Sequence, residues 1–151
     1  MLGKLTEQET DEVFKRNVVG RIGCSDAEKT YVVPIHYVYD GRYIIGHSRE
    51  GLKIAVMRKN PKVCFEVDEM PGADNWKSVI AWGTYEELTD EEDKYYAMKK
   101  MADRMMHLKV SETAKPPHLS ENRVHPHQPG DIKVIVFRIV VQEKSGRFEK
   151  N

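Results

Sequence analysis

The sequence has 151 residues, 40% of them hydrophobic, and Lys plus Arg equal Asp plus Glu at 24 each. This length fits one domain with a sizeable core, so we predict a single domain over residues 1–151, and the balanced charge excludes recruitment to nucleic acid or to membranes by net charge. No apolar run approaches the roughly 20 residues that span a bilayer, and the polar first residues do not make a signal peptide, so we expect a cytoplasmic protein.

The first part of the chain predicts a helix followed by three strands. Thr6 and Glu9 form a capping box, and a helix over residues 7–17 follows. Apolar residues at strand spacing predict strands over residues 18–24, 31–39 and 42–47, and Asp40-Gly41 is a strong hairpin signal between the last two.

Pro34 lies inside the second predicted strand and forfeits a ladder hydrogen bond there. The strand is therefore expected at an edge of the sheet or with a bulge. A flat ligand can lie against such a strand and use its free backbone groups, and an ordinary edge strand is the alternative.

The segment over residues 43–53 has the composition of a phosphate-binding turn. An apolar strand runs into a turn that carries His47 and Ser48, and Lys53 follows in the first turn of a short helix predicted over residues 52–59. Helix N-termini present unpaired N–H groups and a partial positive charge, to which Lys53 adds a full one. We predict that this segment binds the phosphate of a small molecule; the alternative is a solvated helix face.

The second part of the chain predicts three more strands and one helix. The strands cover residues 62–67, 76–88 with a bend at Gly83, and 132–142, the last apolar on both faces and so expected at the centre of the sheet. A helix is predicted over residues 90–106. The intervening loops cover residues 70–75 and 107–130, and a short tail covers residues 145–151.

Strands are the majority element in this prediction, and hairpins or short links join consecutive strands. This favours a mainly β fold, an antiparallel barrel with α-helices packed on its flank, over a doubly wound parallel sheet.

Three of the six histidines, His118, His125 and His127, fall in the predicted loop 107–130 and raise the question of a metal site. Zinc sites usually combine such residues with cysteines or carboxylates at defined spacings on rigid elements. Cys24 and Cys64 are far from this loop in the sequence and lie in apolar runs. No metal site is therefore predicted, and the role of the loop stays open.

The order of these motifs resembles the pyridoxamine 5′-phosphate oxidase-related flavoproteins, and within them the branch similar to nitroimidazole-resistance proteins. The resemblance covers nearly the whole chain and is weakest over residues 107–130. The motifs that carry it are the strand with Pro34, the Asp40-Gly41 hairpin, His47-Ser48 at a strand end, Gly51 and Lys53, Asn60-Pro61, residues 63–67, residues 78–83 with Glu87, residues 137–139 and Ser145-Gly146-Arg147.

The resemblance implies a split β-barrel that binds FMN as a homodimer, with each flavin near the subunit interface. It implies that Lys53 and Ser48 contact the FMN phosphate, that Val33, Pro34 and Ile35 line the isoalloxazine, and that His47 lies near the flavin. It also implies that Ser78 completes the phosphate or ribityl contacts and that Arg147 approaches the ligand.

The sequence departs from the oxidase itself at two places. The oxidase carries an additional basic residue directly before the phosphate lysine, where this chain has Leu52, and its C-terminal substrate-binding segment has no counterpart here beyond Arg147. Oxidation of pyridoxamine phosphate is therefore not expected.

The resemblance favours an FMN-dependent oxidoreductase, a reductase of small electron-poor substrates, with NAD(P)H or a partner reductase as electron donor and His47 as the candidate for proton transfer. Two alternatives remain open. One is a non-catalytic flavin-binding or sensing module. The other is a haem-binding split barrel, with His36, His47 or the His118–His127 loop as ligand candidates.

Overall fold

The computed structural model of the protein describes residues 1–107 and 133–151. The predicted loop over residues 107–130 with His118, His125 and His127 thus lies almost wholly outside the described residues. In chain order, the elements are β1 (Leu2–Lys4), α1 (Glu7–Arg16), β2 (Val19–Ser25), β3 (Thr30–His36), β4 (Val38–Tyr39), β5 (Tyr43–Arg49), α2 (Leu52–Lys59), β6 (Lys62–Gly72), β7 (Asn75–Glu87), α3 (Glu91–His107) and β8 (Val134–Lys150).

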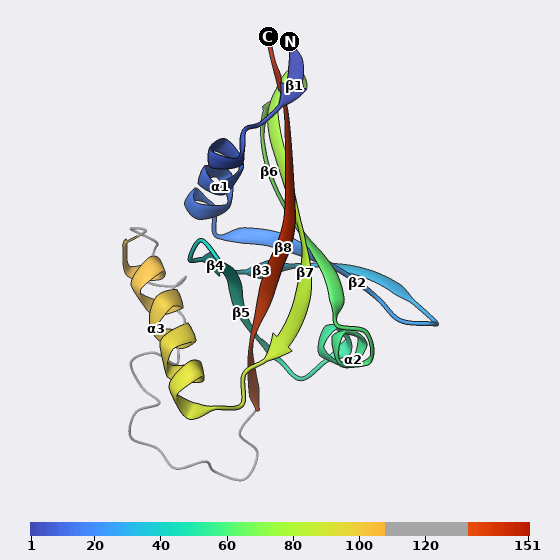
Figure 1. Ribbon diagram of the computed structural model, residues 1–151, viewed down its shortest axis with the longest axis vertical. Coiled ribbons are helices and arrows are strands. Elements are labelled where there is room, and N and C mark those ends of the chain that lie inside the picture. The colour runs from blue at the N-terminus through green and yellow to red at the C-terminus, as the bar shows by residue number, and fades with distance from the viewer. Residues whose placement is uncertain (108–132) are drawn as a thin grey trace.

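All described strands belong to one antiparallel sheet in the order β3-β2-β6-β7-β8-β5-β4, and β1 also pairs with β8. The sheet is strongly twisted, with α1 and α3 on one side of the view in Figure 1 and α2 on the other. β8 pairs with both β7 and β5, so the predicted central position of the last strand is confirmed. The mainly β class with flanking helices is confirmed as well.

The two ends of the sheet come together in space. A Cβ atom built on Gly46 of β5 would lie 3.2 Å from Cδ1 of Ile35 in β3, although β3 and β5 are far apart in the order of strands. The sheet therefore curls into a barrel, and the gap between β3 and β5 is its split.

Local signals placed several elements correctly. The capping box is present, since the Glu9 amide donates to the Thr6 hydroxyl oxygen at 3.1 Å and the Thr6 amide to the Glu9 carboxylate at 2.8 Å. Gly41 has a φ of 96° in the predicted hairpin, where Asp40 accepts from the amides of Arg42 and Tyr43. The helix predicted over residues 52–59 is α2.

Long-range pairing corrects three predictions and adds one strand that was not predicted. The strand predicted over residues 31–39 is interrupted at Tyr37, whose amide donates to the Val18 carbonyl oxygen. The loop predicted over residues 70–75 is largely strand, because a register shift between Glu69 and Gly72 accommodates Pro71. The tail predicted over residues 145–151 continues β8 to Lys150, paired with β7 and β1, and β1 itself had no sequence signal.

The predicted bend at Gly83 is a register shift in the β7–β8 ladder between Trp82 and Gly83. A Cβ atom on Gly83 would lie only 2.3 Å from the backbone oxygen of Val140, so the close approach of the two strands requires glycine.

Two apolar clusters stabilise the fold. The larger one fills the barrel with side chains from the strands, from α1 (Val13, Phe14) and from α2 (Ile54, Val56, Met57). The smaller one joins α3 to β4, β5 and β8 through Ala97, Met101, Val38, Ile45 and Val136. Among the helices of the described ranges, none has the length and apolar character needed to cross a membrane.

Candidate functional site

Strand β3 forms an edge of the sheet, as the proline in its middle predicted. Pro34 pairs with Arg21 of β2 without a break in register. β3 is the end strand of the described sheet, and the Pro34 side chain is exposed. Ile35 points into the barrel and is 8% exposed, whereas Pro34 faces the barrel exterior. Of the three residues predicted to line a ring, Pro34 presents its side chain to the exterior, Ile35 can contribute only backbone, and Val33 is half-buried on the interior side.

His47 lies on β5, the strand on the other side of the split. It is in register with Val136, and directly opposed residues of an antiparallel pair share a face. Val136 packs in the cluster beneath α3, so the His47 side chain also faces the exterior. The structure thus brings Pro34 and His47 to the same side of the barrel on the two strands that flank the split.

The N-terminus of α2 is left open by this chain. Gly51 occupies the N-cap position and provides no side-chain cap, whereas Thr6 caps α1 and Asp90 accepts from the Asp93 amide at the start of α3. The first turn of α2 has no acidic residue but contains Lys53. An uncapped N-terminus beside a lysine leaves backbone donors and a positive charge for an anion.

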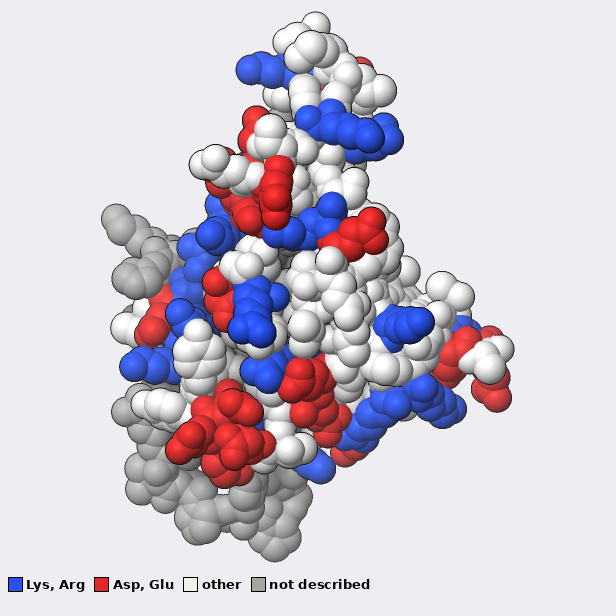
Figure 2. Space-filling view, in the orientation of Figure 1, with Lys and Arg blue, Asp and Glu red and all other residues white. Residues whose placement is uncertain are grey.

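Two of the four basic side chains on α2 and just before it have carboxylate partners. Arg58 pairs with Glu50 and Glu87, and Lys59 lies 3.9 Å from Asp26. Lys53 and Arg49 form no ion pair with any residue in the described part of the chain. Figure 2 shows basic side chains gathered where Figure 1 places α2. We call Arg49, Gly51, Lys53 and the first turn of α2 the cradle.

Ser48 lies at the edge of the cradle, but its hydroxyl donates to the carbonyl oxygen of Arg49 at 2.7 Å. A hydrogen bond from Ser48 to a phosphate therefore requires rotation of this side chain. Lys53 is half-buried, and its charge partly offsets the increase that burial causes in the pKa of the Cys24 thiol of β2.

Ser78 and Arg147 are register partners on β7 and β8. The Ser78 hydroxyl donates to Glu66 at 3.1 Å, and Arg21 lies 3.5 Å from Glu66 and 3.4 Å from Asp68. Burial, with the nearby Asp68, raises the pKa of Glu66.

Ser78 and Arg147 lie away from the point where β7 meets α2. β7 contacts α2 at Glu87, which is bound to Arg58, and Ser78 is about 30 Å from Glu87 along the strand at roughly 3.3 Å per residue. Pro34, Arg21, Glu66 and Ser78 instead form a row across β3, β2, β6 and β7 on the barrel exterior.

An apolar groove runs beside this row and was not predicted. Val32, Gly23, Cys64 and Trp82 are successive register partners across the same four strands, and they line a cavity of about 550 Å³. Gly23 forms its floor, since a Cβ atom there would lie 2.7 Å from Sγ of Cys64. Val32 and Trp82 are 65% and 40% exposed. No local sequence signal marks this groove, because only strand register places Gly23 between Val32 and Cys64.

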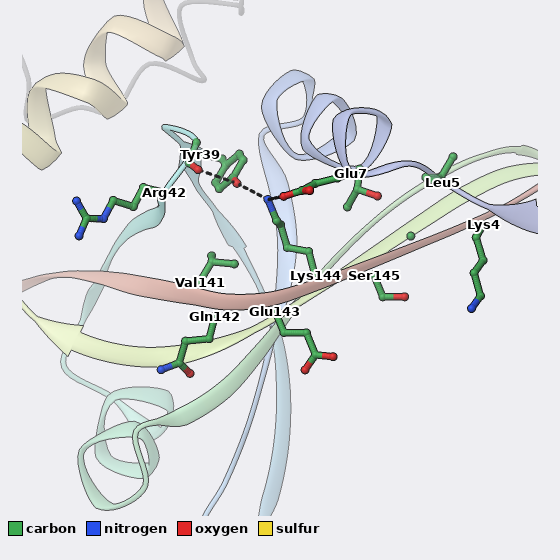
Figure 3. A pocket seen from close by; sticks show the side chains of 13 residues that line it. Lys4, Leu5, Glu7, Tyr39, Arg42, Val141, Gln142, Glu143, Lys144 and Ser145 are labelled. Atoms are coloured by element: carbon green, nitrogen blue, oxygen red, sulfur yellow. Dashed lines mark hydrogen bonds and ion pairs between the residues drawn. The ribbon is translucent and has the colours of Figure 1, made fainter.

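A larger cavity of about 640 Å³ lies between α1, the β4–β5 hairpin and β8 (Figure 3). Its central cation, Lys144, donates to Asp11 at 2.6 Å and lies 3.3 Å from the Tyr39 hydroxyl. This ion pair joins α1 to β8 and neutralises the positive charge of Lys144 with a carboxylate of the same chain. None of the predicted site residues lines the cavity, so we assign it a structural role.

The cradle suits a phosphate. The apolar groove, with Val32 and Trp82 exposed, suits contact with another apolar surface. No group of three or more His, Cys, Asp or Glu side chains arranged to hold a metal occurs within residues 1–107 and 133–151.

Comparison with known proteins agrees with this geometry. The sequence pattern of the family described as pyridoxamine 5′-phosphate oxidase matches residues 6–148. An uncharacterised protein of Rhizobium meliloti is 34% identical over 84 residues, and this chain spans 56% of that protein's length.

Solved structures show the same fold. The crystal structure of an FAD-binding protein of Mesorhizobium loti matches with a TM-score of 0.77 at 29% identity, covering 100% of this chain and 98% of that one. A proposed 5-nitroimidazole antibiotic resistance protein of Bacteroides thetaiotaomicron matches with a TM-score of 0.72 at 19% identity, covering 98% and 87% of the two chains. The antiparallel split β-barrel predicted from the sequence is confirmed.

Proposed function

Because this chain belongs to the pyridoxamine 5′-phosphate oxidase family, we propose that it binds FMN and acts as an oxidoreductase on small electron-poor substrates. The observation that carries the proposal is the cradle. Its helix N-terminus has no side-chain cap, and its lysine has no carboxylate partner among the described residues. Both features are suited to the terminal phosphate of FMN.

The remaining residues have roles that follow from their positions. Lys53 and Arg49 hold the phosphate, while Pro34 and His47, on the two strands beside the split, hold the ring. Bound flavin supplies the redox chemistry, and the protein supplies binding and orientation. His47 is the candidate for proton transfer, since an imidazole changes charge near neutral pH. The electron donor is NAD(P)H or a partner reductase.

We further propose a homodimer, because the site predicted from the sequence is incomplete within one chain. Ser78 and Arg147 lie on the barrel exterior, away from the contact of β7 with α2, and in a dimer they would approach the ligand of a neighbouring subunit. The exposed apolar groove through Val32 and Trp82 lies on that same exterior and provides area for the contact.

The first experiment is a visible spectrum of the purified protein, followed by extraction and mass measurement of the cofactor. Flavin absorbance with FMN mass is the expected result. The Mesorhizobium loti relative is described as FAD-binding, and FAD mass would correct the nucleotide while leaving flavin binding in place. A colourless protein that does not take up added FMN or FAD would contradict the proposal.

Turnover separates the oxidoreductase from a non-catalytic flavin module. Stopped-flow reduction by NADPH or NADH, followed by mixing with a nitroimidazole or a quinone, should reoxidise the flavin in step with loss of the acceptor. Bound flavin that is reduced but passes electrons to neither acceptor would favour the non-catalytic module instead.

A further inference from the structure

We propose that Arg58 is a positioning residue for phosphate binding, because it draws the carboxylate of Glu50 away from the cradle. The inference rests on the proposed flavin function and goes beyond it by assigning a role to an ion pair outside the predicted site. Glu50 directly precedes the N-cap residue Gly51, and it is the acidic residue nearest in sequence to Lys53. An uncompensated carboxylate there would repel a bound phosphate.

An ion pair ties Glu50 to Arg58 in the last turn of α2. The Arg58 guanidinium donates to both oxygens of Glu87, at 2.9 and 3.1 Å, and its remaining terminal nitrogen donates to Glu50. The hydrogen bond from Arg58 lowers the pKa of Glu50, so this carboxylate is ionised and paired. The carboxylate of Glu50 is therefore held against the same guanidinium that binds Glu87 of β7.

Glu87 also has a hydrogen-bond partner in the barrel. The buried Tyr85 hydroxyl donates to Glu87 at 2.8 Å. A chain of hydrogen bonds therefore runs from Tyr85 through Glu87 and Arg58 to Glu50. The forked guanidinium is needed for this, because it must bind two carboxylates at once, which a lysine does less well.

A second arginine provides a matched control. Arg16 of α1 binds Glu69 of β6 with two hydrogen bonds of 2.6 Å, so it also ties a helix to a strand through a forked ion pair. It lies on a different helix from the cradle, and the carboxylate that it binds is not next to Lys53. Loss of Arg16 should cost structural stability without affecting phosphate binding.

The test compares FMN with riboflavin, which has the same ring but no phosphate. Dissociation constants are measured by flavin fluorescence at low ionic strength for wild type, Arg58→Met, Glu50→Gln, the double variant and Arg16→Met. Arg58→Met should weaken FMN binding by about five-fold and leave riboflavin unchanged, because one unit charge is uncovered near the phosphate. Adding Glu50→Gln should restore FMN binding, and Arg16→Met should change neither ligand.

Each other outcome has a definite meaning. Equal weakening of FMN and riboflavin in Arg58→Met, or failure of Glu50→Gln to restore FMN binding, would overturn the role of Arg58. If Arg58→Met does not fold, Arg58→Lys serves instead and should weaken FMN selectively by about two-fold. A wild-type protein that binds neither ligand refutes the proposed function itself, whereas FMN binding that is equal in wild type and Arg58→Met refutes only this inference.

Discussion

Lys53 and Lys59 lie on the same short helix but in different surroundings. Lys53 is half-buried beside the uncapped N-terminus, whereas Lys59 is at the C-terminal end, 3.9 Å from Asp26. We expect Lys53→Gln to weaken FMN binding by about ten-fold, the value of one charge-assisted hydrogen bond to phosphate. Lys59→Gln should leave the dissociation constant unchanged. Equal values for the two variants, measured by fluorescence titration, would remove Lys53 from the phosphate site.

Leu52 marks the place where the oxidase has a second basic residue, and the structure leaves it 46% exposed at the start of α2. Leu52→Arg should therefore tighten FMN binding by roughly three-fold or more, since a cation is added near the phosphate without disturbing the core. Leu52→Gln is the control for loss of the apolar side chain. No difference between the Arg and Gln variants would place the phosphate elsewhere.

At the scale of elements, the bulge in β7 depends on a glycine. A Cβ atom at Gly83 meets the Val140 backbone oxygen at 2.3 Å, whereas one at Gly72 meets nothing closer than 3.6 Å. Gly83→Ala should lower the free energy of unfolding by about 3 kcal/mol, because the backbone of two paired strands must move apart. Gly72→Ala should change it by less than about 0.5 kcal/mol in urea titrations.

The tie between α1 and β6 should be sensitive to pH. Hydrogen bonds from Arg16 and Asn17 lower the pKa of Glu69, so its stabilising effect is present above the ordinary glutamate pKa and is lost as pH falls through the lower, folded-state value. Glu69→Gln should thus destabilise the protein by about 1 kcal/mol at neutral pH and by much less in acid.

Glu66 should behave in the opposite way. Burial raises its pKa, so the free energy of unfolding falls as pH rises through the folded-state pKa and Glu66 becomes ionised. Glu66→Gln should leave stability at neutral pH unchanged or higher. Urea unfolding of both variants across the acid range checks the two signs, and a loss of stability in Glu66→Gln equal to that in Glu69→Gln would show the argument to be wrong.

At the scale of the whole molecule, the proposed homodimer makes the exterior of β2, β3, β6 and β7 the contact surface. Val32→Glu, at a position 65% exposed in the groove, should yield monomers that have also lost flavin affinity. Tyr95→Glu, at a position 71% exposed on α3, is the matched control and should stay dimeric. Sedimentation velocity gives the masses, and a Val32→Glu protein with the wild-type mass would exclude this surface.

The sequence was most informative where neighbouring residues determine the structure. The capping box at Thr6, the turn at Asp40-Gly41 and the helix over residues 52–59 each depend on hydrogen bonds within a few residues, and each was placed correctly. Pro34 predicted an edge strand, because a missing amide excludes the centre of a sheet.

What the sequence could not provide was register. Pro71-Gly72 indicates a loop locally, yet a shift in the β6–β7 ladder accommodates it within a long hairpin. The pairing of Ser78 with Arg147 and the alignment of Val32, Gly23, Cys64 and Trp82 into a groove also follow from pairing between distant strands.

The position of β8 has a consequence for biosynthesis. It is the strand that joins β5 to β7, yet it follows all the other strands in the chain. While a nascent chain lacks residues 134–150, the β4–β5 hairpin and the β2-β3-β6-β7 sheet have no ladder between them and leave unpaired edges exposed. Closure of the barrel must therefore wait until synthesis has passed β8, and until then the growing chain exposes strand edges that a chaperone can cover.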